Sequence, residues 1–183
     1  MITGIESDGR KREILHGDLV SIDGFGLLIT GESGSGKSDC ALGLLSRGHK
    51  LVADDVISMV AEGGKVFGRP PKRFEAILRI HGLGIFDCRQ VFGQSSFQPL
   101  VQISFCVELS SDLAGLDLQS EVECIDSFSI LGVSIPRLRL RNIVGRDLPL
   151  LVETAVRVHC REGSLSALVM AEHDELILQN SVS

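Results

Sequence analysis

Short apolar runs separated by glycine-rich turns dominate the first third of the chain. Residues 19–22 and 27–30 are apolar runs of strand length on either side of an Asp23-Gly24 turn signal, and a third run covers residues 51–53. Across residues 37–48 the apolar positions recur at helical spacing, the last turn is basic and glycine closes the segment. Strand, turn, helix and strand in this order predict a βαβ unit, in which the two outer strands can pair in parallel.

The rest of the chain predicts further elements and makes the sheet mixed. In chain order they are a β-hairpin of residues 55–60 and 65–67 joined at Glu62-Gly63-Gly64, a helix over 73–78, strands over 101–109 and 135–141, and a helix over 147–162 capped by Asp147. No repeat or linker is visible, so residues 1–183 are expected to form one domain. The predicted fold class is α/β, with a nucleotide-binding core, a mixed sheet, an additional β-hairpin and a C-terminal helix.

Composition excludes several classes of function. With 44% hydrophobic and 23% charged residues, the 183-residue chain can build a core, and its net charge of -6 and lack of Trp and Tyr argue against nucleic-acid binding. The longest nearly uncharged stretch, residues 19–30, has about half the length of a membrane span. The first residues lack a basic start and an apolar signal core, so we expect a cytoplasmic protein without a membrane partner.

The charge is unevenly distributed along the chain. Residues 108–129 contain six acidic residues and no Lys or Arg, which predicts a solvated loop. The strand predicted over 135–141 follows it with a basic face of Arg137, Arg139 and Arg141. An acidic protein can therefore still present a cationic surface to phosphate.

One motif carries specific chemistry. Gly31, Glu32, Ser33, Gly34, Ser35, Gly36, Lys37 and Ser38 satisfy the pattern G-x-x-x-x-G-K-[ST] between a predicted strand and a predicted helix, which is the context of a P-loop. Glycines let successive backbone N–H groups point inward at a helix N-terminus, so the expected guest is a polyphosphate. Lys37 would reach the β- and γ-phosphates of ATP, and the Ser38 hydroxyl would ligate Mg²⁺. An ordinary glycine-rich turn is the alternative.

Two adjacent carboxylates follow the strand at residues 51–53. If this strand lies beside the strand that leads into the P-loop, Asp54 and Asp55 are close to the phosphates. Alternation sends them in opposite directions, so one can help to hold Mg²⁺ while the other takes a proton from an attacking hydroxyl. Solvated loop carboxylates are the alternative.

Four sequence blocks together resemble the catalytic domain of the HPr kinase/phosphorylase family. They are the P-loop with its helix and residues 47–55, residues 82–87 with Phe92-Gly93, residues 130–136, and residues 145–153. The resemblance covers about residues 13–161 and leaves about a dozen residues for the additional N-terminal domain of many relatives. It implies an ATP-dependent kinase that phosphorylates a serine of the phosphocarrier HPr, regulates carbohydrate metabolism, and reverses the reaction by phosphorolysis with inorganic phosphate, which yields pyrophosphate.

The resemblance also assigns roles to residues. Asp55 would deprotonate the serine and reprotonate it in reverse, Asp54 would join Ser38 on Mg²⁺, and His16 matches the catalytic histidine of the family. On spacing alone, His16 reads as a histidine at a strand end. Arg146 would clamp phosphate, and its alternative is a basic loop paired with the acidic segment. The family works as a hexamer through C-terminal helices, for which packing within a monomer is the alternative.

Two departures from the family pattern leave a second function open. Arg79 and His81 stand where the family usually has a Mg²⁺-binding Glu and an Arg, and a cation cannot ligate Mg²⁺. Residues 108–129 also lack the catalytic Arg that the family carries in this region. The rival reading is a nucleotide-binding regulatory module with degenerate phosphotransfer. A small-molecule P-loop kinase is a third reading, but the chain has no recognisable arginine-rich lid.

Overall fold

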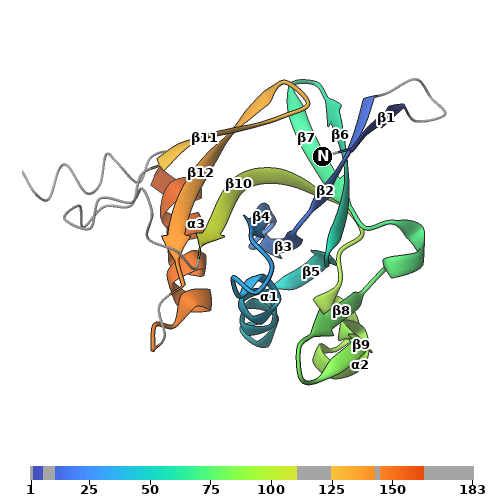
Figure 1. Ribbon diagram of the computed structural model, residues 1–183, viewed down its shortest axis with the longest axis vertical. Coiled ribbons are helices and arrows are strands. Elements are labelled where there is room, and N and C mark those ends of the chain that lie inside the picture. The colour runs from blue at the N-terminus through green and yellow to red at the C-terminus, as the bar shows by residue number, and fades with distance from the viewer. Residues whose placement is uncertain (1, 6–10, 111–124, 143–144, 163–183) are drawn as a thin grey trace, which may run out of the picture.

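A strongly curled sheet forms the body of the molecule (Figure 1). The computed structural model describes residues 2–5, 11–110, 125–142 and 145–162. In this part of the chain the sheet has ten strands: β1 (Ile2–Ile5), β2 (Lys11–His16), β3 (Asp18–Ile22), β4 (Phe25–Gly31), β5 (Lys50–Ala53), β6 (Val56–Glu62), β7 (Lys65–Arg69), β10 (Val101–Ser110), β11 (Ile125–Ile130) and β12 (Val133–Arg141). Their order is β1-β2-β6-β7-β10-β4-β3-β5, and β12 joins β10 and carries β11.

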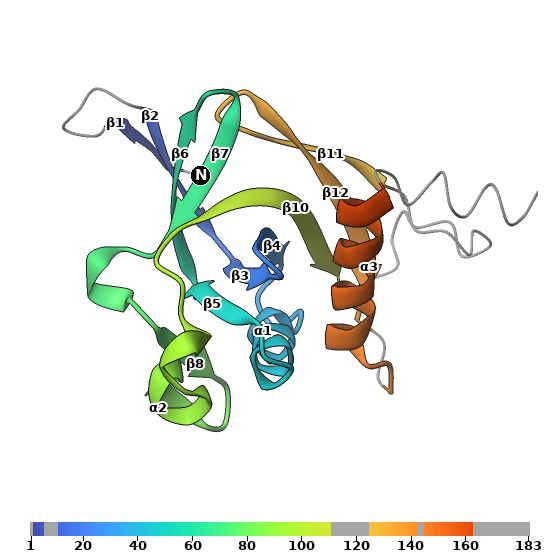
Figure 2. The same ribbon diagram turned by 180° about the vertical axis from the view of Figure 1, so that it is seen from behind.

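The remaining elements are short or helical. They are α1 (Lys37–Ser46), α2 (Cys88–Phe92), α3 (Leu148–Glu162), the 3-10 turns η1 (Lys72–Phe74) and η2 (Gln94–Ser96), and a separate antiparallel pair of β8 (Ile77–Ile80) and β9 (Gly84–Asp87). Helices α1 and α3 lie side by side along one face of the sheet, with β8, β9 and α2 beyond α1 (Figure 2). No helix of the described ranges is long and apolar enough to cross a membrane.

The sheet is mixed, and its strand order corrects the predicted βαβ pairing. β10 is parallel to both β4 and β12, whereas β3 is antiparallel to β4 on one side and to β5 on the other. β4 and β5 therefore run in the same direction without pairing. The reason is local, because a tight turn at Asp23-Gly24 pairs β3 with β4 before α1 returns the chain. Strand β3 consequently begins between the ends of β4 and β5.

Both faces of the central strands are buried. Leu27 and Ile29 of β4 pack under the two helices, in a core that includes the fully buried Phe105 of β10. Leu28 points to the opposite face and packs against Met59 and other apolar residues of the curled half formed by β2, β6 and β7. The continuous apolar run of β4 is what two covered faces require.

The chain passes twice between the two halves of the curled sheet, and both passages bend at the same place. β2 ends at His16 and β3 begins at Asp18, with Gly17 between them; β5 ends at Ala53 and β6 begins at Val56. The Gly17 N–H donates to the Asp55 carbonyl oxygen at 3.2 Å, so the two bends are in contact.

Helix α3 is fixed to the end of α1 by a buried carboxylate. Glu153 is 4% exposed, and its side chain meets Arg47 Nε, His49 Nε2 at 3.3 Å and Arg157 Nη1 at 2.6 Å. Arg157 continues to Asp23 at 3.0 Å. Burial alone would raise the pKa of Glu153, but the hydrogen bonds from Arg47 and His49 and the charge of Arg157 outweigh it and lower the pKa.

Most predicted elements are confirmed. The strands over 19–22, 27–30, 51–53, 101–109 and 135–141, the hairpin (β6–β7), the first helix and the C-terminal helix all form, with boundaries that differ by a few residues. Asp147 Oδ1 accepts the backbone N–H of Leu150 at 3.0 Å, as a cap should.

Two further sequence predictions are wrong. The helix over residues 73–78 is instead the short turn η1 followed by β8, because residues 77–80 pair with residues 84–87 across the turn at Gly82. The acidic segment is not a loop at its ends. Glu108 lies in β10 and Asp126 in β11, where both meet Arg137 and Arg139 of β12 at 2.6 to 3.2 Å. Residues 111–124 lie outside the described residues.

Candidate functional site

The glycine-rich loop (residues 31–38) turns the chain from β4 into α1. Gly31 has a φ of 135° and Gly36, at the helix start, a φ of 93°, both in the region that favours glycine. A Cβ at Gly31 would overlap the carbonyl oxygen of Leu109, and one at Gly36 would overlap the side-chain amide of Asn142. That amide donates to the Ser35 carbonyl oxygen at 3.0 Å. The loop is therefore held between the ends of β10 and β12.

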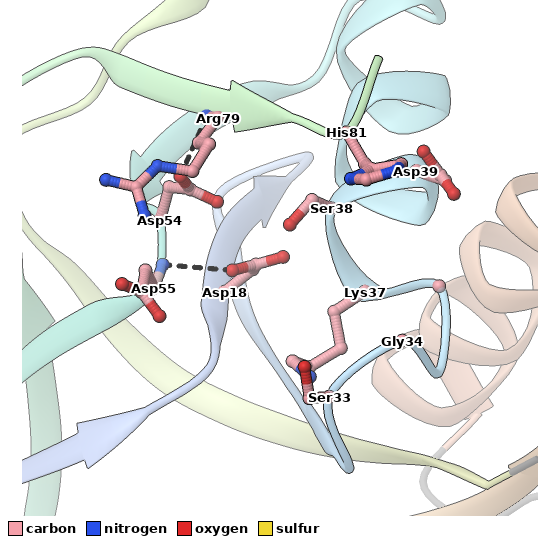
Figure 3. Close-up of a pocket in the computed structure, with 11 residues that line it drawn as sticks. Asp18, Ser33, Gly34, Lys37, Ser38, Asp39, Asp54, Asp55, Arg79 and His81 are labelled. Carbon is pink, nitrogen blue, oxygen red and sulfur yellow. Dashed lines mark hydrogen bonds between the residues drawn. The ribbon is translucent and has the colours of Figure 1, made fainter. Parts of the chain in front are cut away.

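Lys37 and Ser38 lie at the start of α1 and open onto a cavity of about 430 Å³ (Figure 3). Lys37 Nζ donates to the carbonyl oxygens of Gly31 at 3.0 Å and Glu32 at 2.7 Å. The cavity is lined by Asp18, Ser33, Gly34, Gly36, Lys37, Ser38, Asp39, Asp54, Asp55, Arg79 and His81. Its lining contains most of the predicted loop residues, whereas Ser35 is buried beneath the loop.

Asp54 and Asp55 form the second bend between β5 and β6. Asp54 is half-buried, and its Oδ2 accepts the backbone N–H of Arg79 at 2.9 Å. Asp55 has a φ of 64°, and its side chain is 63% exposed. The two carboxylates thus occupy different environments at one edge of the cavity, and they do so in a bend rather than through the alternation of a strand. The neighbourhood differs from the prediction, because β3 separates these residues from the strand that leads into the loop.

His16 lies next to Asp55 at the rim. Its Nδ1 is 3.1 Å from the Asp55 carbonyl oxygen and 3.7 Å from Asp55 Oδ1, and its side chain is 78% exposed. Arg146 is exposed just before α3 and does not belong to the cavity lining. Lys37 and Asp55 therefore line one cavity, His16 contacts Asp55 without lining it, and Arg146 lies outside it.

A second, smaller cavity of about 140 Å³ adjoins Asp55. Phe74, Ile77 and Ile85 give it an apolar wall, and Asp54, Asp55, Val56 and Arg79 complete it. Phe74 and Ile85 are 50% and 62% exposed. An exposed apolar surface beside a carboxylate can receive a peptide segment that carries a hydroxyl group.

Asp18 is the site residue that the sequence analysis missed. It begins β3, is 1% exposed, and accepts the Asp55 backbone N–H on Oδ1 at 3.1 Å. Burial, and then the negative charge of Asp54, raises the pKa of Asp18 to about 7; burial also raises the pKa of Asp54. The available signal was a single acidic residue in the apolar run after His16-Gly17. It becomes informative only once β3 is known to lie between β4 and β5.

Oxygen ligands for a hard cation converge on the cavity floor. Asp18 Oδ2 and Asp54 Oδ1 are buried and without a hydrogen-bond partner, and the Ser38 hydroxyl opens onto the same cavity. Within the described ranges, no three or more His, Cys, Asp or Glu side chains form a metal site by themselves. These residues fit Mg²⁺, which is usually held by one or two carboxylates and completes its shell with phosphate and water.

Comparison with known proteins identifies the family of this chain. The family model of the HPr Serine kinase C-terminal domain matches residues 10–172. Curated relatives named HPr kinase/phosphorylase from Burkholderia lata and Burkholderia cenocepacia are each 37% identical over 151 residues, which is 80% of this chain and 45% of each relative. The solved structure of the Hpr(Ser) kinase/phosphatase from Coxiella burnetii matches with a TM-score of 0.75 and 32% identity, over 82% of this chain and 97% of that one.

A mixed, curled α/β sheet with a C-terminal helix is the fold class that this chain shares with the solved relative. The chain belongs to the HPr serine kinase C-terminal domain family. It spans about half the length of the curated relatives it matches.

Proposed function

We propose that this chain is an ATP- and Mg²⁺-dependent protein kinase/phosphorylase that acts on a serine of HPr, and that residues 13–161 form its catalytic core. The observation that carries the proposal is the convergence of the loop residues Lys37 and Ser38 with Asp54 and Asp55 on one cavity, in a chain of this family. The two Burkholderia relatives and the Coxiella burnetii protein bear names for this activity.

The glycine-rich loop binds the triphosphate of ATP. Backbone N–H groups of residues 31–38 and the positive end of α1 favour the anion, and Lys37 Nζ exchanges its loop carbonyls for the β- and γ-phosphates. Ser38 and Asp54 hold Mg²⁺, which supplies charge neutralisation at the phosphates when bound. The cavity volume of about 430 Å³ accommodates this part of the nucleotide.

Asp55 moves the proton in both directions. In the kinase reaction it accepts the serine hydroxyl proton while the serine oxygen bonds to the γ-phosphorus and the bond to ADP breaks. In phosphorolysis an oxygen of inorganic phosphate bonds to the phosphoserine phosphorus while the bond from this phosphorus to the serine oxygen breaks. Pyrophosphate leaves, and Asp55 returns the proton to the serine oxygen. His16 supports Asp55, since its Nδ1 is 3.1 Å from the Asp55 carbonyl oxygen.

Arg146 acts on phosphate only when it closes over the site, because it is exposed outside the cavity lining. Its planar guanidinium would bind phosphate through two hydrogen bonds. We further propose a cytoplasmic homohexamer joined through α3, on which Leu150 is 44% exposed. Light scattering coupled to size-exclusion chromatography tests the oligomer, and a monomeric mass would contradict it.

The decisive experiment incubates the protein with Mg²⁺-ATP and HPr and measures the intact mass of HPr, with Asp55→Asn as the inactive control. One added phosphoryl group on a serine supports the kinase. A second incubation of phosphorylated HPr with inorganic phosphate should produce pyrophosphate.

The second candidate is a regulatory module that binds nucleotide without efficient transfer. Arg79 in the cavity lining favours it, because a guanidinium supplies no oxygen ligand to a metal. ATP binding without any mass gain on HPr would establish this module in place of the kinase.

A further inference from the structure

Asp18 is the most deeply buried acidic side chain in the cavity, and the proposed function does not use it. It is 1% exposed and stands at the start of β3, between the ends of the two strands that carry the glycine-rich loop and Asp54. Figure 3 shows its carboxylate pointing into the space between Asp54 and Ser38.

Asp18 and Asp54 are held in the same way. One oxygen of each accepts a backbone N–H, from Asp55 at 3.1 Å and from Arg79 at 2.9 Å respectively. The other oxygen of each, Asp18 Oδ2 and Asp54 Oδ1, is buried without a hydrogen-bond partner. Each carboxylate is therefore held through one oxygen, which leaves its second oxygen for another partner.

The cations of the cavity lining do not satisfy these oxygens. Lys37 Nζ is taken by two loop carbonyls, and the hydrogen bond from Arg79 to Asp54 is made by the backbone N–H. The carboxyls of Asp18 and Asp54 are close enough to share a proton, which adds to the effect of burial in raising the pKa of Asp18. A group of positive charge that fits between the two oxygen atoms can take the place of that proton and satisfy both. A small divalent cation meets this description, and Ser38 adds a hydroxyl oxygen on the opposite side.

We propose that Asp18 is a direct ligand of the divalent cation, so that this site holds the metal through two carboxylates, Asp18 and Asp54, together with Ser38. The inference rests on the proposed function, because the phosphates of ATP supply further oxygen atoms of the shell. Asp18 would be the second acidic ligand of the metal. It comes from the antiparallel strand β3 and belongs neither to the loop motif nor to the Asp54-Asp55 pair.

The test uses Mn²⁺ as the probe and its electron paramagnetic resonance signal as the readout, with a non-hydrolysable ATP analogue present. Asp18→Asn should weaken Mn²⁺ binding by more than about tenfold. Asp39→Asn is the matched control, since Asp39 lines the same cavity but is exposed. It should change Mn²⁺ affinity by less than about threefold. Unchanged Mn²⁺ affinity in Asp18→Asn overturns the proposal.

A loss caused by misfolding is separable from a loss of ligation. The amide introduced by Asp18→Asn keeps an oxygen for the Asp55 N–H and removes one of two neighbouring buried negative charges, so the melting temperature of this variant in EDTA should be no lower than that of the original protein. A second carboxylate added next to Asp54, in Asp18→Asn/Arg79→Glu, should restore most of the Mn²⁺ affinity. If Asp18→Asn binds Mn²⁺ weakly and the added Arg79→Glu does not improve the affinity, direct ligation by Asp18 is also overturned.

Binding of a fluorescent ATP analogue in EDTA distinguishes the two levels of proposal. If the original protein binds no nucleotide either in EDTA or with Mg²⁺, the proposed function fails. If nucleotide binds equally to the original protein and to Asp18→Asn and their Mn²⁺ affinities are also equal, only the role of Asp18 fails.

Discussion

Glu153→Gln tests whether the buried carboxylate of α3 fixes this helix to the end of α1. The substitution keeps the shape of the side chain and removes the charge that Arg47, His49 and Arg157 share. Loss of one member of a buried ion pair costs about 3 to 5 kcal/mol, and the partial exposure of both arginines places this case near 3. For a domain of this size, about 3 kcal/mol corresponds to a decrease in melting temperature of about 6 to 12 °C.

The assay is urea unfolding followed by far-ultraviolet circular dichroism, because a chain without Trp or Tyr has no useful intrinsic fluorescence. Glu75→Gln removes the same charge from an exposed position and should cost less than about 0.5 kcal/mol. If Glu153→Gln lowers the free energy of unfolding by less than about 1 kcal/mol, the reasoning is refuted, since a loss of that size is typical of an exposed ion pair. In a double-mutant cycle, Arg47→Met should couple to Glu153→Gln by more than about 0.5 kcal/mol.

The pH dependence has a definite sign. Because the pKa of Glu153 is lowered in the folded protein, its stabilisation is complete above the ordinary value of 4.5 and is lost as pH falls through the folded-state pKa. The difference between the original protein and Glu153→Gln should therefore shrink as the pH falls below about 4.5. A difference that grows below this pH would contradict the assignment.

Three predictions concern the site. Lys37→Met should weaken binding of a fluorescent ATP analogue by about 10- to 100-fold through loss of a charge-assisted hydrogen bond, whereas the exposed Lys50→Met should change it by less than about twofold; equal effects would contradict the role of Lys37. Asp55→Asn should lower the rate of HPr phosphorylation by about 10²- to 10⁴-fold with unchanged nucleotide affinity, and a near-normal rate would remove Asp55 as the base. Gly36→Ala should cost about 1 to 2 kcal/mol in urea unfolding from its positive φ, plus the overlap with Asn142. Asn142→Ala should relieve this overlap. If Gly36→Ala costs the same free energy of unfolding with and without Asn142→Ala, the contact with Asn142 is excluded.

The sequence was sufficient for the elements whose signals are local. The loop of residues 31–38, α1 and the hairpin at Gly63-Gly64 are encoded by glycine positions, apolar spacing and turn residues within a few positions of one another. The cap at Asp147 is equally local. Asp54 and Asp55 could be placed at the site because they directly follow a buried strand.

Features that depend on distant partners could not be predicted in this way. Residues 77–80 carry an apolar spacing compatible with a helix, and only their pairing with residues 84–87 makes them a strand. Asp126 belongs to a strand, and Arg137 and Arg139 of β12 neutralise it across the sheet. Asp18 was overlooked for the same reason: local pattern makes it a strand residue, and the antiparallel insertion of β3 makes it part of the cavity.

The two bends at Gly17 and Asp54-Asp55 lie both where the sheet curls and at the edge of the site. A change in the curvature of the sheet therefore also changes the shape of the site. His16 belongs to one half of the sheet and Asp18 to the other, and Gly17 is the joint between them. The Asp55 backbone hydrogen-bonds to both His16 and Asp18 across this joint. Any flexing of one half against the other must change the distances among these three side chains. A ligand that stiffens the joint should therefore slow amide hydrogen exchange along β2 and β6, far from the glycine-rich loop itself.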